Sequence, residues 1–346
     1  MAPLGRRLPG VGRKPPGVSP VGSCLRLSLL DRSRTRAGHP EGAALTDTVE
    51  RAVAAERLGY SRFWVVEHHG VPGIASGAPA VLLAAIGART AAIRLGSGGV
   101  MLPNHQPLVV AEQFLMLAGL YPGRVDLGLG RSLGFTAPVR RALRCPDDER
   151  DSFVADIAEV RSYLERTSPV TARPLVEDPL PIFVLATGRG IEVAARLGLP
   201  VVLGGPVLSR PELGDLLAAY RRDFRSHRDS RPYVTVSMDV LVADTDAEAR
   251  ELALPEVWAM VRSRRTGVFD SLEPVAAIRD QPWDDQDAER VARGLDAVTA
   301  GSPATVRRRL GALADRTGAD ELLTSGATYD RAALAASDAS LAALLA

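Results

Sequence analysis

The stretch "AERLGYSRFWVVEHHG" (residues 55–70) contains the unit from which the rest of the chain is built. Residues 44–60 have the pattern of a helix closed by a glycine, and residues 62–66 are an apolar run of strand length. Two histidines and a glutamate follow that run at residues 67–69. A helix, a short buried strand and a polar cluster at its end are typical of an α/β protein with functional side chains at the strand ends.

The same unit recurs in both directions along the chain. Apolar runs that predict strands lie at residues 25–30, 62–66, 93–102, 124–130, 181–186, 200–205, 233–243 and 319–326. Helical patterns separate them at residues 44–60, 78–90, 107–120, 150–165, 190–198, 211–224 and 303–317, and an alanine-rich helix ends the chain. Strands that alternate with single helices predict a parallel sheet. Eight such units favour a closed (β/α)8 TIM barrel, although periodicity alone leaves an open doubly wound sheet as the alternative.

The chain divides into a short arm and one large domain. Residues 1–24 are rich in proline, glycine and basic residues without apolar periodicity, which indicates a disordered N-terminal arm, with a binding tail as the alternative. Residues 25–346 are expected to form a single barrel domain. Residues 244–300, between the seventh strand and the helix that follows it, are too long for a simple loop. They are expected to be an insertion that starts with an added helix and is otherwise solvated and mobile.

Composition excludes several classes of partner. The 346 residues include 42 basic and 41 acidic side chains, a net charge of +1, so no surplus of charge points to nucleic acid or an anionic membrane. Cys24 and Cys145 are the only cysteines, so a disulfide framework is not expected. No apolar run approaches the roughly 18 residues of a membrane helix. We therefore expect a cytoplasmic protein with no membrane or nucleic-acid partner.

The histidine pair is the first candidate for chemistry. Neighbouring side chains on a strand point to opposite faces, so one of His68 and His69 should face the mouth of the barrel. This divergence argues against a shared metal ion, and no cysteine or carboxylate spacing completes a ligand set. We expect no metal site. The alternative is that both imidazoles only form hydrogen bonds to neighbouring loops.

Paired glycines end the third predicted strand. Gly98 and Gly99 lie where side chains would normally fill a barrel. They indicate a bulge or a close approach of the backbone by a flat ligand, and the alternative is a simple bend before the following loop.

Residues suited to phosphate follow the fourth and fifth strands. Arg131 comes after one strand, and Thr187, Gly188, Arg189 and Gly190 come between the next strand and its helix. A helix N-terminus exposes backbone amides, and an arginine and a hydroxyl add charge and a donor. The pattern matches no standard phosphate loop, so an ordinary helix cap with a surface arginine remains the alternative.

These residues resemble the bacterial luciferase-like flavin monooxygenase superfamily, in the branch found in natural-product biosynthesis. The resemblance rests on "AERLGYSRFWVVEHHG", "IRLGSGGVMLPNHQPLVVAEQFLMLAGLYPGRVDLGLGRS" and "GSPATVRRRLGALADRTGADEL", and it covers about residues 25 to 335. It implies a barrel, usually dimeric, that uses reduced FMN from a separate reductase and dioxygen to oxidise a small organic substrate. Two alternatives stay open: a hydride-transfer enzyme with a deazaflavin coenzyme, and a catalytically silent barrel subunit.

The resemblance also assigns roles to individual residues. It implies that His68 is the catalytic histidine and that Gly98 and Gly99 form a cis peptide against the flavin ring. It implies that Arg131 and Thr187 bind the flavin phosphate, with the backbone of residues 188–190. Near relatives often have two serines where this chain has Ala186 and Thr187, so one hydroxyl is missing.

Overall fold

The computed structural model describes residues 25–134, 136–144 and 152–345. The arm expected over residues 1–24 lies outside this part of the chain, as do the first residues of the helix expected over 150–165.

Eight parallel strands close into a barrel. They are β1 (Arg26–Asp31), β2 (Arg62–Val65), β3 (Arg94–Ser97), β5 (Val125–Gly130), β6 (Ile182–Ala186), β7 (Val201–Gly204), β8 (Val234–Val242) and β10 (Glu321–Ser325). Neighbours pair in the order β10-β1-β2-β3-β5-β6-β7-β8, and the pairing of β8 with β10 closes the ring. The closed barrel is confirmed, and the open sheet is excluded. Two short strands, β4 (Val100–Met101) and β9 (Thr299–Gly301), extend β5 and β8.

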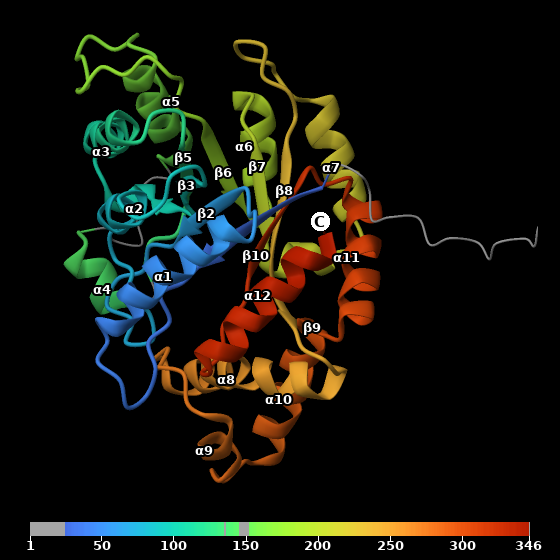
Figure 1. The fold of residues 1–346 in the computed structure, drawn as a ribbon. Helices are drawn as coiled ribbons and strands as arrows, with labels where there is room; N and C mark the ends of the chain where they lie inside the picture. Colours follow the sequence, from blue (N-terminus) through green and yellow to red (C-terminus); the bar gives the residue numbers. More distant parts are fainter. Residues whose placement is uncertain (1–24, 135, 145–151, 346) are drawn as a thin grey trace, which may run out of the picture.

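Helices surround the barrel on its outside (Figure 1). They are α1 (Ala43–Arg57), α2 (Pro79–Gly87), α3 (Pro107–Leu120), α5 (Phe153–Leu164), α6 (Gly190–Leu197), α7 (Leu213–Arg222), α11 (Pro303–Thr317) and α12 (Arg331–Leu345). A short helix that the sequence did not predict, α4 (Ala137–Ala142), follows β5. No helix in the described ranges is long and apolar enough to cross a bilayer.

The continuous apolar runs of the strands are explained by burial on both faces. Along β2, Phe63 and Val65 belong to the core between strands and helices, whereas Trp64 points the other way and packs edge-on against Phe183 inside the barrel. Each face of the strand is therefore dry, which is why alternation of polar and apolar residues is absent. This packing fixes β2 and so fixes the polar residues that follow it.

Buried ion pairs fill the barrel at the amino ends of its strands. Arg62 donates to Asp126 at 2.6 Å and to Glu321 at 3.0 Å, and both carboxylates are almost fully buried. Asp126 also accepts from Arg94. Barrel enzymes carry their chemistry at the opposite end, so we assign this cluster to stability.

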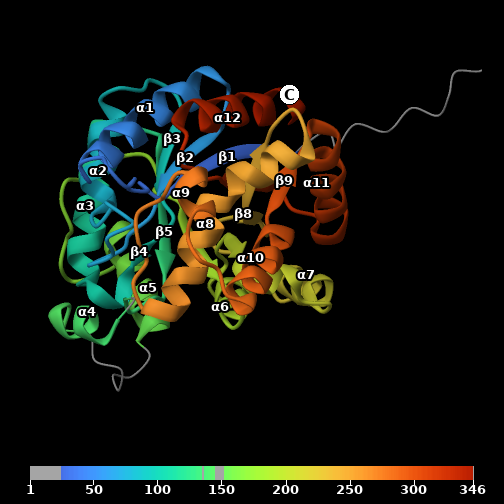
Figure 2. The same ribbon diagram turned by 90° about the horizontal axis from the view of Figure 1, so that it is seen from below.

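The insertion between β8 and α11 is helical throughout most of its length. It contains α8 (Asp246–Thr266), α9 (Val275–Arg279) and α10 (Asp285–Ala297), and Thr245 caps α8. The expected added helix is present, and the remainder, which is largely exposed, forms two further helices whose Ile278 and Val291 are buried in a cluster with Trp258. Figure 2 looks onto the end of the barrel that these helices cross.

Candidate functional site

A cavity of about 520 Å³ lies at the carboxyl ends of the barrel strands. Its size falls in the range of about 300–1,000 Å³ that small-molecule sites occupy. Segments that follow four strands contribute to its walls, together with residues of the strands themselves. The lining residues are Leu30, Val66, Glu67, His68, Gly98, Gly99, Met101, Gly130, Arg131, Ser132, Leu185, Ala186, Thr187, Val202, Gly204, Ser237 and Leu323.

Most of the residues singled out in the sequence meet in this cavity. His68, Gly98, Gly99, Arg131 and Thr187 all line it, although they come from four separate strand ends. Topology brings them together, because parallel strands of a closed barrel all end at one face.

The segment Gly188–Gly190 does not reach the cavity wall. The side chain of Arg189 is exposed, and this segment forms the start of α6. The amide of Ile191 already donates back to the carbonyl of Gly188, at 2.9 Å. Residues 188–190 therefore stay a prediction of the sequence and are not among the residues that line the cavity.

Backbone forms one wall of the cavity at Gly98 and Gly99, whose shared peptide bond is cis, as the resemblance implies. A Cβ atom on Gly98 would lie 2.5 Å from Cδ1 of Leu30, and one on Gly99 would lie 2.8 Å from the carbonyl oxygen of Gly128. Position 99 therefore requires glycine because backbone lies behind it, whereas a side chain at position 98 would force the side chain of Leu30 to move. Ser97, by contrast, turns away and bonds to the backbone of Gly128.

The rim of the cavity carries donors suited to an anion. Arg131, Ser132 and Thr187 are all exposed at the rim of the cavity. A guanidinium with two hydroxyls is a donor set that fits a phosphate group. Ser132 stands at the polar end of the fourth predicted strand, but the sequence alone assigns it no binding role.

His68 supplies the imidazole of the site. Strand β2 ends at Val65, so strand alternation does not govern residues 67–69. The backbone amide of His68 donates to Ser76, which holds the segment in place. Burial, and then the positive charge of Arg32, lowers the pKa of His68 to about 4. The ring is therefore neutral near pH 7 and can donate through one nitrogen while it accepts through the other.

His69 diverges from His68 and bonds to Glu67 instead. One oxygen of Glu67, Oε1, lies 2.7 Å from Nε2 of His69 and 2.7 Å from Nε2 of His105. The other oxygen accepts the amide of Met101 at 3.0 Å. Burial alone would raise the pKa of Glu67, but these bonds, from His105 first, lower it.

Glu67 therefore joins the end of β2 to the segment that follows the cis peptide. The ligand atoms of Glu67, His69 and His105 lie within 4.8 Å of one another, an arrangement that could hold a metal ion. The sequence does not indicate this group because His105 lies far along the chain in another loop. The contacts have hydrogen-bond lengths and use both carboxylate oxygens, so we interpret the group as a structural network.

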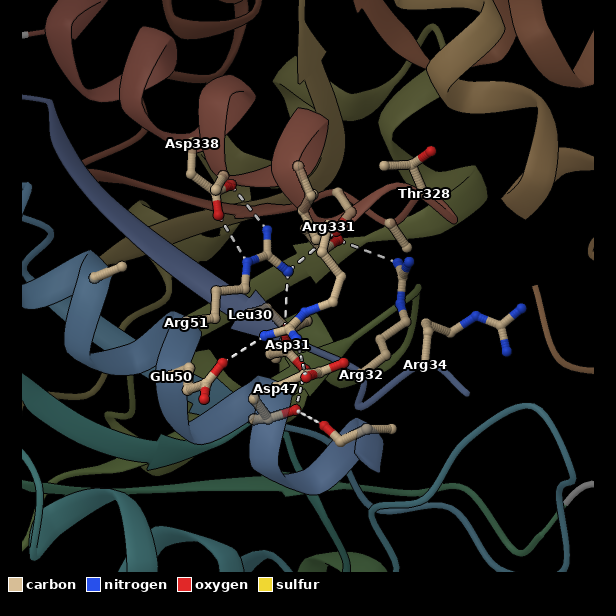
Figure 3. A pocket seen from close by; sticks show the side chains of 18 of the residues that line it. Leu30, Asp31, Arg32, Arg34, Asp47, Glu50, Arg51, Thr328, Arg331 and Asp338 are labelled. Carbon is tan, nitrogen blue, oxygen red and sulfur yellow. Dashed lines mark hydrogen bonds and ion pairs between the residues drawn. The ribbon is translucent and has the colours of Figure 1, made fainter. Parts of the chain in front are cut away.

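A second cavity, of about 250 Å³, lies beside the barrel between α1 and α12. Figure 3 shows that its charges face one another: Arg51 bonds to Asp338 and to Asp31, and Arg331 bonds to Glu50. Burial alone would lower the pKa of Arg51, but the two aspartates raise it above its usual range. Because the cations are compensated by the protein itself, this cavity is not the candidate site.

Comparisons with known proteins agree with this architecture. A sequence model of the luciferase-like monooxygenase family matches residues 25–321. A protein of Escherichia coli (strain K12) named luciferase-like monooxygenase is 36% identical over 315 residues, which are 89% of this chain and 93% of that protein. The crystal structure of apo-MsnO8 superposes with a TM-score of 0.82 at 33% identity, and covers 93% of this chain and 98% of that one.

Two more distant structures share the fold and differ in coenzyme. One is the oxygenating constituent of 3,6-diketocamphane monooxygenase of Pseudomonas putida in complex with FMN, with a TM-score of 0.70, 20% identity and coverage of 93% and 98%. The other is an F420-dependent secondary alcohol dehydrogenase, with a TM-score of 0.64, 14% identity and coverage of 93% and 99%. At these identities only the shared fold follows.

Proposed function

The chain belongs to the luciferase-like monooxygenase family, and from that premise we propose that it is an FMN-dependent monooxygenase whose reduced flavin comes from a separate reductase. One observation carries the proposal. The cavity at the carboxyl ends of the strands combines a backbone wall at Gly98 and Gly99, a neutral imidazole at His68 and an anion-binding rim at Arg131. The backbone wall and the rim suit the ring and the phosphate of a flavin mononucleotide, and the imidazole suits proton transfer beside it.

The residues fit FMN part by part. The phosphate would sit at the rim, where the guanidinium of Arg131 and the hydroxyls of Ser132 and Thr187 supply donors. The flat ring would lie against Gly98 and Gly99, where the absence of side chains permits close approach. Apolar side chains, among them Leu30, Val66 and Leu185, complete the walls and would keep water from the ring.

When bound and reduced, the flavin supplies the electrons with which dioxygen is activated. The protein binds it, orients it and excludes water. His68 lines the cavity in the neutral state, so it can hydrogen-bond a reacting oxygen or move a proton at one ring nitrogen. Glu67 does not touch the reacting centre in this proposal. It holds Met101 and therefore the wall that begins at Gly98.

We also propose that the protein is a homodimer. The neighbouring helices α2 and α3 expose four large apolar side chains, and we propose that they form one apolar surface: Val81, Val109, Met116 and Leu120. Such a surface is uncommon on a monomer. Light scattering should give the mass of two chains for the wild type and a mass closer to one chain for Met116→Lys. A wild type with the mass of a single chain would refute the dimer.

The experiment that tests the proposed function compares coenzymes. Turnover that requires reduced FMN and dioxygen supports a monooxygenase. Anaerobic turnover with a deazaflavin coenzyme, and none with FMN, would instead favour hydride transfer, the chemistry named for the F420-dependent dehydrogenase of the same fold. Binding of neither coenzyme would indicate a silent barrel.

A further inference from the structure

A second chamber adjoins the candidate site, and the insertion roofs it. It has a volume of about 540 Å³ and shares His68 with the site cavity. Helices α8 and α10 provide most of its walls, and Figure 2 shows both helices lying across the end of the barrel. The apolar residues of the chamber are Ile74, Val257, Met260, Val261, Phe269, Ala297 and Val298.

The acidic residues of this chamber are already neutralised by the protein. Glu256 of α8 accepts from Arg34 at 2.7 Å and from Arg32 at 3.5 Å, and Asp239 of β8 accepts from Arg32 at 2.7 Å. These pairs fasten α8 to the loop after β1. They also leave no acidic group in the chamber without a cation beside it.

The basic residues of the chamber exceed the acidic ones. Besides Arg32 it is lined by Arg264, Arg290 and Arg293. Arg293 pairs with Glu289 on the outer surface of α10. Arg264 is exposed and Arg290 half-buried, and neither has a hydrogen-bond or ion-pair partner among the described residues. Two guanidinium groups therefore border an apolar chamber without an acidic partner.

We propose that this chamber holds the substrate of the proposed reaction and that the substrate is an amphipathic organic acid. Its acidic group would pair with Arg264 and Arg290, because a guanidinium offers two parallel donors to a carboxylate. Its apolar body would lie along Met260 and Phe269. The part to be oxidised would then reach His68, the residue common to both cavities. That the bound acid is oxidised rests on the proposed function, whereas its binding in the chamber does not.

The test is a binding experiment with four eight-carbon probes: octanoate, octanesulfonate, 1-octanol and octyltrimethylammonium. Calorimetric titration of the full chain should show that both anions bind more tightly than the alcohol and the cation. Substitution of Arg264→Gln and Arg290→Gln together should weaken octanoate binding by about tenfold, as expected for loss of charge-assisted hydrogen bonds, and leave 1-octanol unchanged. Arg279→Gln on α9, which lies outside the chamber, is the matched control.

Three results would overturn the inference. They are an equal octanoate affinity in the wild type and the double variant, tighter binding of octyltrimethylammonium than of octanoate, or a loss of octanoate affinity in Arg279→Gln as large as in the double variant. Thermal melting confirms that the variants are folded, and the two single variants carry the test if the double one melts early. Reduced FMN is titrated into the same proteins. If the wild type binds octanoate through the two arginines but does not bind reduced FMN, the proposed function is refuted and this inference stands. If the wild type binds reduced FMN but its octanoate binding does not depend on the arginines, this inference is refuted and the proposed function stands.

Discussion

Nε2 of His69 lies 2.7 Å from Oε1 of Glu67, and this contact turns the second histidine of the pair away from the cavity that its neighbour lines. Two adjacent imidazoles therefore have different surroundings, and their substitution should have different consequences.

His68→Ala should leave the barrel folded and slow the reaction. General acid–base assistance typically contributes about 10²–10⁴-fold, so a loss of turnover in that range is expected with pre-reduced FMN in a single-turnover assay. His69→Ala should mainly reduce stability, by about 1–3 kcal/mol, because it leaves a buried oxygen of Glu67 with one donor fewer. Normal chemistry in His68→Ala beside a large rate loss in His69→Ala would show that the roles are reversed.

The lowered pKa of His68 predicts how stability depends on pH. The folded protein protonates this ring near pH 4, whereas an unfolded chain does so near its ordinary value of about 6.5. Between these values the unfolded state binds more protons, so the free energy of unfolding should fall as the pH is lowered from about 6.5 to 4. Urea denaturation of wild type and His68→Gln over this range checks the effect. A wild type that loses no more stability on acidification than His68→Gln would contradict the assignment.

Arg131 should contribute directly to flavin affinity. Charge-assisted hydrogen bonds are worth about 1.5–3 kcal/mol, so Arg131→Ala should weaken the binding of reduced FMN by roughly ten- to a hundredfold in an anaerobic titration. Arg196 is an exposed arginine in the last turn of α6, outside the cavity, and Arg196→Ala is therefore the control. Equal affinities for Arg131→Ala and the control would remove Arg131 from the site.

The buried cluster at the amino ends of the strands should affect stability without changing the site. Arg62→Met leaves Asp126, which is 0% exposed, and Glu321 without their shared cation, so a loss of about 3 kcal/mol or more is expected from urea denaturation. Arg222→Met removes a surface pair whose side chains are 69% and 57% exposed, and it should change stability by less than about 0.5 kcal/mol. A large loss of FMN affinity in folded Arg62→Met would argue against this division of roles.

Sequence patterns predicted the barrel well because its strands are largely buried on both faces and alternate with single helices. The run at residues 62–66 becomes β2 almost unchanged, and the helix that precedes it ends at Arg57, two residues before the expected glycine, Gly59. Parallel topology then brings His68, Gly98 and Arg131 to one end of the barrel, so much of the candidate site follows once the barrel is known.

Long-range side-chain contacts could not be predicted in this way. Nothing near Glu67 in the sequence indicates that it meets His105, and nothing near Glu256 indicates that it meets Arg34. The remainder of the insertion is rich in charge, and the sequence does not indicate that Ile278 of α9 and Val291 of α10 join Trp258 in a buried cluster. The burial of these residues depends on α8, which is separated from them in the sequence and packs against them only in the folded chain.

The most direct test of the central claim follows oxygen itself. The protein is supplied with reduced FMN, with dioxygen labelled with the heavy oxygen isotope, and with a set of amphipathic organic acids as candidate substrates. The mass of the product is then measured by mass spectrometry. A flavin monooxygenase places one labelled oxygen atom in the product, and His68→Ala lowers the yield of that product. A product that forms without label, or that forms in the absence of dioxygen, would contradict the account.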